Sequence, residues 1–112
     1  MNTIDPELVE KMMKICVGEG LPDPALATSG AFPEGWVNQY LSLLKSLDDW
    51  QSQEFLPTKL VYCFYRVGYH IGVNYSEWGR ATGKRNQKTE KQLVDIRLAT
   101  ELFITGSFFE LE

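Results

Sequence analysis

The stretch TKLVYCFYRVGYHIGVNYSEW, residues 58–78, decides the fold. Thr58 follows Pro57 as an N-cap, and the apolar residues behind it recur at helical spacing, so we predict a helix that reaches about Asn74 or Trp78. On a helical wheel the core-facing stripe is Leu60, Phe64, Val67 and Ile71, and a second row lies almost opposite, formed by Tyr62, Tyr65, Tyr69 and Val73. A helix that is apolar on both sides lies at the centre of a domain or against a partner. We therefore expect helix 58–78 at the centre of the packing.

Three further helices are predicted around this central one. Asp5-Pro6-Glu7 supplies an N-cap, a proline at the first helical position and an early negative charge for a helix over about 6–17. An amphipathic stretch predicts a helix over about 33–51, and Thr89 with Gln92 has capping-box spacing for a last helix over about 89–106. Residues 19–32, rich in proline and glycine, are expected to form a long packed loop. The sequence thus predicts an all-α, four-helix, bundle-like single domain over residues 1–112.

Composition narrows the class of protein. The chain has 112 residues, of which 44% are hydrophobic and 23% charged, which is typical of a globular domain and excludes a disordered chain and a disulfide-rich miniprotein. The N-terminal stretch MNTIDPELVEKMMK is acidic early and has no long apolar core, so no signal peptide is predicted, and no apolar window approaches the length of a membrane span. Cys16 and Cys63 are predicted to be buried, reduced thiols. We therefore expect a cytoplasmic protein without membrane association.

No complete catalytic or metal-binding set of residues is visible in the sequence. His70 is the one histidine, and Cys63 lies seven residues before it, which is two helical turns and about 10 Å along the axis. That separation is too long for a hydrogen-bonded dyad, and two ligands do not make a tetrahedral zinc site. We therefore predict no catalytic residues, no metal and no cofactor, and we favour a non-enzymatic protein.

The tyrosine row provides the leading hypothesis for function. Either a second surface covers this row, or the same chain does so through the first helix, the loop 19–32 or the C-terminal Phe108-Phe109. The surplus of apolar surface on the third and fourth helices favours a small interaction module, either a homodimer or an adaptor to another protein. The predicted interface residues are Tyr62, Tyr65, Tyr69, Val73, Phe108 and Phe109.

Two alternatives stay open. Residues 79–91 hold five cations and one carboxylate, a charge of +4 in a chain of net charge −4, so we expect a basic loop there with an acidic body of −8 around it. That loop can bind nucleic acid or a small anion through Arg80, Lys84, Arg85 and Lys88, although the acidic body disfavours nucleic acid. The other alternative is a small-anion or ligand pocket lined by Trp36, Tyr40, Trp50, Arg66 and His70.

Overall fold

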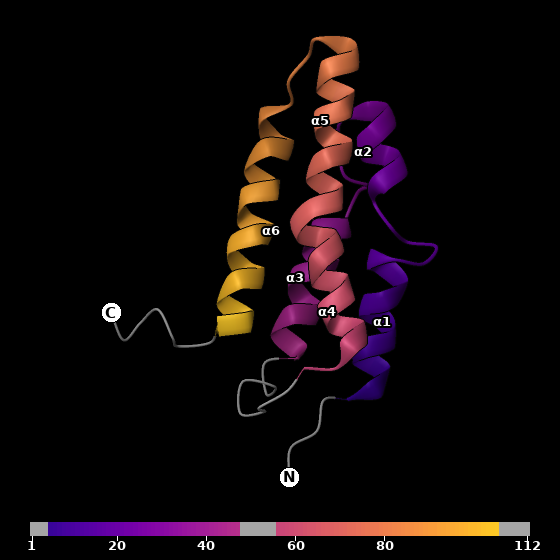
Figure 1. Ribbon diagram of the computed structural model, residues 1–112, viewed down its shortest axis with the longest axis vertical. Helices are drawn as coiled ribbons and strands as arrows, with labels where there is room; N and C mark the ends of the chain where they lie inside the picture. Colours follow the sequence, from indigo (N-terminus) through magenta and orange to yellow (C-terminus); the bar gives the residue numbers. More distant parts are fainter. Residues whose placement is uncertain (1–4, 48–55, 106–112) are drawn as a thin grey trace, which may run out of the picture.

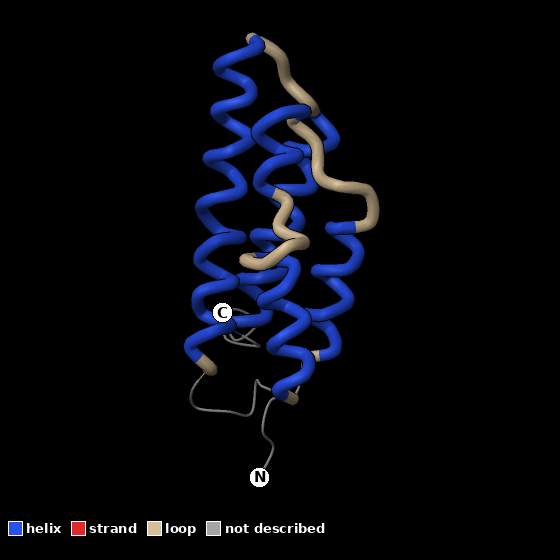
Figure 2. Tube along the Cα trace, turned by 90° about the vertical axis from the view of Figure 1, so that its right-hand side faces the viewer, coloured by secondary structure: helices blue, strands red, loops and turns tan. Residues whose placement is uncertain are grey.

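The protein is an all-helical, bundle-like assembly in the computed structural model, which describes residues 5–47 and 56–105 (Figures 1 and 2). The elements are α1 (Pro6–Cys16), α2 (Asp23–Ser29), α3 (Trp36–Ser46), α4 (Thr58–Tyr65), the π-helical turn η2 (Arg66–His70), α5 (Ile71–Thr82) and α6 (Gln87–Thr105). This result confirms the predicted fold class. None of the helices described here is long and apolar enough to cross a membrane.

The central helix of the prediction is confirmed. α4, η2 and α5 follow one another as one rod, with α6 on one side of it and α1 and α2 on the other (Figure 1). The predicted core stripe is buried in full, namely Leu60, Phe64, Val67 and Ile71. α1 packs on α4 and α3, α2 packs on α5, and α6 packs on α3 and η2. The rod therefore touches helices from both ends of the chain.

The rod contains a π turn that the sequence did not predict. At this turn the backbone N–H of Ile71 donates to the carbonyl oxygen of Arg66, five residues back instead of four. The rod also extends beyond the predicted end, because α5 reaches Thr82.

α1 and α3 begin close to where they were predicted. The Asp5 side chain caps α1 by accepting a hydrogen bond from the backbone N–H of Glu7 at 2.9 Å. α3 begins at Trp36, later than the predicted residue 33, because Gly35 adopts a left-handed φ of 80° just before it. Trp36 donates its indole N–H to the carbonyl oxygen of Ile15 at 2.9 Å, which joins α3 to α1. The predicted end of this helix, residues 48–51, lies outside the described residues.

The segment 19–32, predicted as a packed loop, contains the short helix α2. Asp23 and Pro24 occupy its first turn, as is usual for an acidic residue and a proline at a helix start. The helix ends at Gly30, whose φ of 67° lies in the left-handed region. α2 packs lengthwise on α5, so the segment is part of the bundle.

The segment 79–91, predicted as a basic loop, is mostly helical. α5 ends at Gly83, which has a φ of 68°, and α6 begins at Gln87. Asn86 supplies the cap of α6, since its Oδ1 accepts a hydrogen bond from the backbone N–H of Thr89 at 3.1 Å. Thr89 was the predicted cap, but it is buried and its hydroxyl donates to the carbonyl oxygen of Gly30 at 2.7 Å. The prediction was wrong here because a tertiary contact uses the threonine.

Candidate functional site

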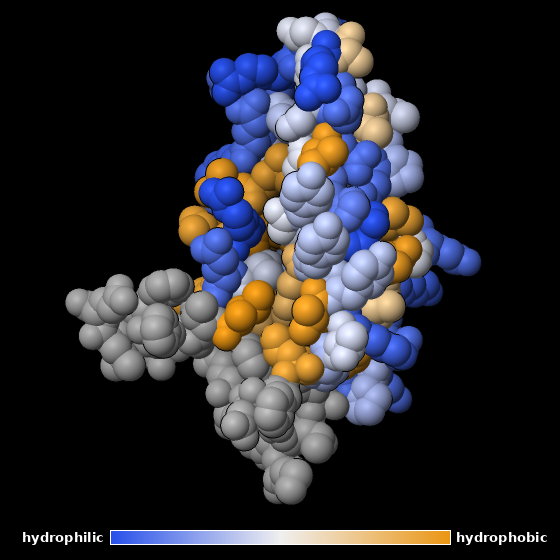
Figure 3. Space-filling model, viewed as in Figure 1, coloured by the Kyte–Doolittle hydropathy of each residue, from blue (hydrophilic) through white to orange (hydrophobic). Residues whose placement is uncertain are grey.

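The exposed large hydrophobic side chains lie on two elements that pack against each other, the rod and α6. Within the described residues, every large hydrophobic side chain that is exposed belongs to the α4–α5 rod or to α6. They are Val61, Tyr62, Tyr65, Tyr69, Val73, Val94, Leu98, Leu102 and Ile104. We call these nine residues the outer face. Figure 3 shows apolar residues along α6 and beside it on the side that faces the viewer.

The tyrosine row on the rod lies in the open. Tyr69 is 58% exposed, and its ring stacks on the ring of Tyr65 with centroids 6.0 Å apart. His70 stands edge-on to both rings, with centroid distances of 5.2 and 5.4 Å. The four predicted interface residues on the rod therefore share one exposed surface. Phe108 and Phe109, the other two, lie outside the described residues.

A second apolar row runs along α6 and was not among the predicted interface residues. Val94, Leu98 and Leu102 recur every four residues on the side of α6 that faces away from the core. The opposite side of α6 is buried through Ile96, Thr100 and Phe103. The spacing of four was the sequence signal for this row, but only the packing of α6 shows that the row is left exposed.

A groove of about 530 Å³ separates the rod from α6. Gly68, Tyr69, Gly72 and Val73 line it on the rod side, and Leu93, Val94 and Arg97 line it on the α6 side. A Cβ atom placed on Gly68 or Gly72 would meet nothing within 4 Å, so the two glycines leave bare backbone at the rod wall of the groove. The outer face thus combines protruding aromatic rings with an open groove.

The four predicted anion-binding cations are not gathered into one site. Arg80 pairs with Glu77 at 3.2 Å, and Arg85 pairs with Glu90 at 2.6 Å. Hydrogen bonds from Arg85 and from the Tyr75 hydroxyl lower the pKa of Glu90 to about 2. Two of the four cations are therefore already matched by carboxylates, whereas Lys84 and Lys88 form no salt bridge within the described residues.

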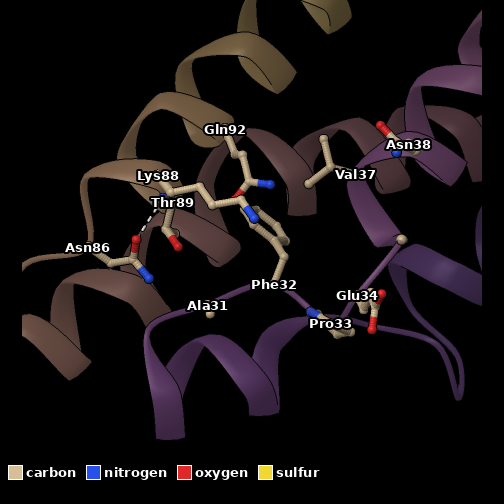
Figure 4. Close-up of a pocket in the computed structure, with 11 residues that line it drawn as sticks. Ala31, Phe32, Pro33, Glu34, Val37, Asn38, Asn86, Lys88, Thr89 and Gln92 are labelled. Carbon is tan, nitrogen blue, oxygen red and sulfur yellow. Dashed lines mark hydrogen bonds between the residues drawn. The ribbon is translucent and has the colours of Figure 1, made fainter.

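A smaller cavity of about 420 Å³ lies where α6 begins, against the turn that precedes α3 (Figure 4). Phe32 and Val37 supply its apolar part, and the side chains of Lys88 and Gln92 extend over the Phe32 ring. Of the four predicted cations, Lys88 alone lines this cavity. At the cavity edge, Asn86 Oδ1 accepts a hydrogen bond from the backbone N–H of Thr89.

The residues of the predicted ligand pocket are placed in three different surroundings. Trp36 and Tyr40 are core residues whose rings stack with centroids 5.4 Å apart. Arg66 is bound by a carboxylate on α2, and His70 lies at the edge of the tyrosine row. Neither of the two cavities described above is lined by any of these four residues. Trp50, the fifth, lies outside the described residues.

The partner of Arg66 is Asp23, in a cluster that joins three elements. The guanidinium donates to Asp23 Oδ2 at 2.9 Å, and the Asn74 amide donates to the same oxygen at 2.7 Å. The Arg66 Nε also donates to the carbonyl oxygen of Cys16 at 3.3 Å. Asp23 Oδ1 is buried and has no hydrogen-bond partner among the described residues. The cluster thus ties α1, α2 and the rod together.

The chain was compared with protein-family models, with curated proteins and with solved structures, and nothing in any of the three matches it. The outer face and its groove are therefore interpreted from their own chemistry.

Proposed function

We propose that this protein is a non-enzymatic interaction module that forms a homodimer through its outer face. The observation that supports this most directly is that all nine exposed large hydrophobic residues belong to the rod and α6, and that Tyr69, Val73 and Val94 among them line the groove between these two elements. Contiguous apolar patches of this kind are uncommon on monomers and mark sites of protein association. Tyrosine suits such a site because its hydroxyl tolerates partial contact with water.

A second copy of the chain is the partner that this surface fits best. Isologous dimers need one surface that is complementary to itself. The outer face has both parts of such a surface, because the stacked rings of Tyr65 and Tyr69 protrude while Gly68 and Gly72 leave open space beside them. In our proposal the tyrosine row of one copy packs against the α6 row of the other, and the glycines allow the two backbones to approach.

The charges around the groove support self-association. Glu77 and Glu90 lie on its lining together with Arg80 and Arg97, so carboxylates and guanidinium groups are balanced there. A surface with balanced charge does not repel its own copy, whereas a surface of one sign would do so. The chain as a whole has a net charge of only −4.

The first test is the solution mass by light scattering over a range of protein concentrations. We expect a species of twice the chain mass of 12.8 kDa that dissociates on dilution. Leu98→Glu places a charge in the α6 row, where the side chain is 55% exposed, and should weaken the dimer by at least about tenfold without unfolding the monomer. Ser42→Glu, at an exposed position of α3 away from the outer face, is the matched control and should leave the mass unchanged.

A second variant separates association from stability. Gly72→Gln replaces a glycine in a helix interior, and its Cβ atom meets nothing within 4 Å, so the monomer should become more stable by about 0.5–1 kcal/mol. The same side chain fills the groove and should weaken the dimer. A monomer at every concentration, or a dimer that both Leu98→Glu and Gly72→Gln leave intact, would contradict the proposed function.

We also infer that the dimer works in a reducing compartment such as the cytoplasm. Cys16 and Cys63 are both free and buried, which is usual for proteins kept reduced. Mass spectrometry after thiol labelling in denaturant would test this inference, and a recovered disulfide from native source material would refute it.

A further inference from the structure

The smaller cavity, at the start of α6, shares no residue with the outer face or with the groove (Figure 4). Its volume of about 420 Å³ lies within the range of about 300–1,000 Å³ that is usual for small-molecule sites. Lys88 and Glu34, two of its lining residues, are exposed, so the cavity is open to solvent. The dimer proposed above does not use this cavity, which makes it a separate candidate site.

The aromatic wall of this cavity, Phe32, is the outer member of a stack of three rings. Phe32 stacks on the Trp36 indole with centroids 5.3 Å apart and planes 16° apart, and Trp36 stacks in turn on Tyr40. Trp36 and Tyr40 are buried and do not line the cavity, whereas Phe32 is half-buried and does. The cavity therefore lies against the part of the Phe32 ring that Trp36 leaves uncovered, where a further flat ring can stack.

Hydrogen bonds hold the surroundings of the Phe32 ring in place. The indole N–H of Trp36 donates to the carbonyl oxygen of Ile15 at 2.9 Å, which fixes the ring beneath Phe32. The buried Thr89 hydroxyl donates to the carbonyl oxygen of Gly30 at 2.7 Å, which ties the start of α6 to the segment that leads to Phe32. Because these walls are already ordered, a ligand that enters the cavity has little side-chain entropy to overcome.

Two opposite charges line the cavity without meeting. Figure 4 shows Lys88 reaching in from α6, while Glu34 stands beyond the Phe32 ring on the turn that precedes α3. Within the described residues, neither side chain forms a salt bridge with the other or with any third group. A cation on one side of the ring and a carboxylate on the other suit a ligand with an anionic group at one end and an N–H donor at the other.

We propose that this cavity binds a small, flat aromatic anion whose ring carries an N–H donor away from its anionic group. The ring lies against the apolar wall formed by Phe32 and Val37. The anionic group accepts hydrogen bonds from the Lys88 ammonium, and the N–H donates to the Glu34 carboxylate. Two kinds of compound share this chemistry, namely aminoaryl carboxylates and nucleoside monophosphates whose base has an exocyclic amine.

The test is an NMR titration of the full chain with para-aminobenzoate and, separately, with adenosine monophosphate. The bound ring should shift the Val37 methyl signals in a saturable way and leave those of Leu98, on the outer face, unchanged. Such a response to either compound supports the proposal and identifies the kind of ligand, whereas no saturable shift with either would overturn it. Cyclohexanecarboxylate has the same charge but no flat ring, so binding as tight as that of para-aminobenzoate would also overturn it.

Variants at exposed positions assign the two ends of the ligand without endangering the fold. Lys88→Gln should weaken the binding of para-aminobenzoate by about threefold to fivefold, the usual effect of losing one solvent-exposed charge pair. Lys91→Gln is the matched control, because Lys91 is an exposed lysine of α6 outside the cavity, and an equal effect of the two variants would contradict the role of Lys88.

Glu34→Ala should weaken the binding of para-aminobenzoate and not that of benzoate, which has no N–H donor. An equal effect on the two compounds would contradict the proposed orientation. Leu98→Glu, which disrupts the proposed dimer, should leave the affinity for para-aminobenzoate unchanged, since the cavity and the outer face share no residue. The failure of one proposal is thereby distinguishable from the failure of the other.

Discussion

Gly30 is the position where a single added methyl group should do the most damage. Its φ of 67° lies in the left-handed region, and it ends α2 where that helix packs on α5. A Cβ atom at this position would lie 2.4 Å from the nearest carbons of the Trp78 ring. Gly30→Ala should therefore destabilise the protein in two ways, through an unfavourable backbone conformation and through a steric clash with the Trp78 indole.

Gly83 provides a control in which only the backbone conformation is unfavourable to alanine. Its φ of 68° is almost the same, but a Cβ atom there would meet nothing within 4 Å. A left-handed alanine costs about 1–2 kcal/mol, and this should be the whole effect of Gly83→Ala. Overpacking typically adds about 1–3 kcal/mol, so Gly30→Ala should lower the free energy of unfolding by about 2–5 kcal/mol.

The assay is urea unfolding followed by circular dichroism, with both variants measured at one low protein concentration. The difference between Gly30→Ala and Gly83→Ala isolates the contact with the indole. In a Trp78→Ala background this difference should become small, because the ring is gone. Equal destabilisation by the two variants would show that Trp78 does not press on Gly30, and would refute the packing of α2 on α5 described above.

Three other perturbations test the interior. Thr100→Val leaves the buried Tyr40 hydroxyl without the acceptor that lies 2.6 Å away. It should lower the free energy of unfolding in urea by about 1–3 kcal/mol, which is more than the effect of Tyr40→Phe. The reverse order of the two variants would contradict this hydrogen bond. Arg66→Leu removes the cation that pairs with the largely buried Asp23 carboxylate. It should lower the free energy of unfolding, measured by thermal denaturation, by about 3 kcal/mol, and an unchanged stability would argue against the ion pair. The pKa of Glu90 is about 2 in the folded protein against an ordinary 4.5, so its stabilising contribution is present above pH 4.5 and is lost as the pH falls toward 2. Glu90→Gln should therefore lower the urea midpoint at neutral pH and not near pH 2, and a constant difference across this range would be inconsistent with the lowered pKa.

The helices could be predicted from the sequence to the extent that their signals are local. The capping of α1 by Asp5 and the core stripe of the rod depend on neighbours within one or two turns, and both are confirmed. The end of the rod was placed too early because Gly79 and the cations after it resemble a loop. The helix in fact continues to Gly83, the glycine with the left-handed φ.

The candidate site was predictable in part. The exposed tyrosine row follows from the helical wheel of the rod, and its residues are where the spacing puts them. The groove was not predictable, because it depends on how far α6 lies from the rod, and that distance is set by packing between segments far apart in the sequence. The contact between the Cys63 thiol and the Met13 sulfur was not predicted for the same reason, since the two residues are 50 positions apart.

The π turn fixes the number of residues that the rod must hold between Arg66 and Asn74. Arg66 and Asn74 both donate to Asp23 Oδ2, although eight residues of regular α-helix would leave them about 80° apart around the axis. A π turn holds about 4.4 residues instead of 3.6, and five residues in this conformation remove most of that offset. Deleting any one of residues 67–70 would restore regular α-helix and turn one donor away from the carboxylate. Substitutions at exposed positions of this turn should be tolerated, whereas a change in the number of its residues should not.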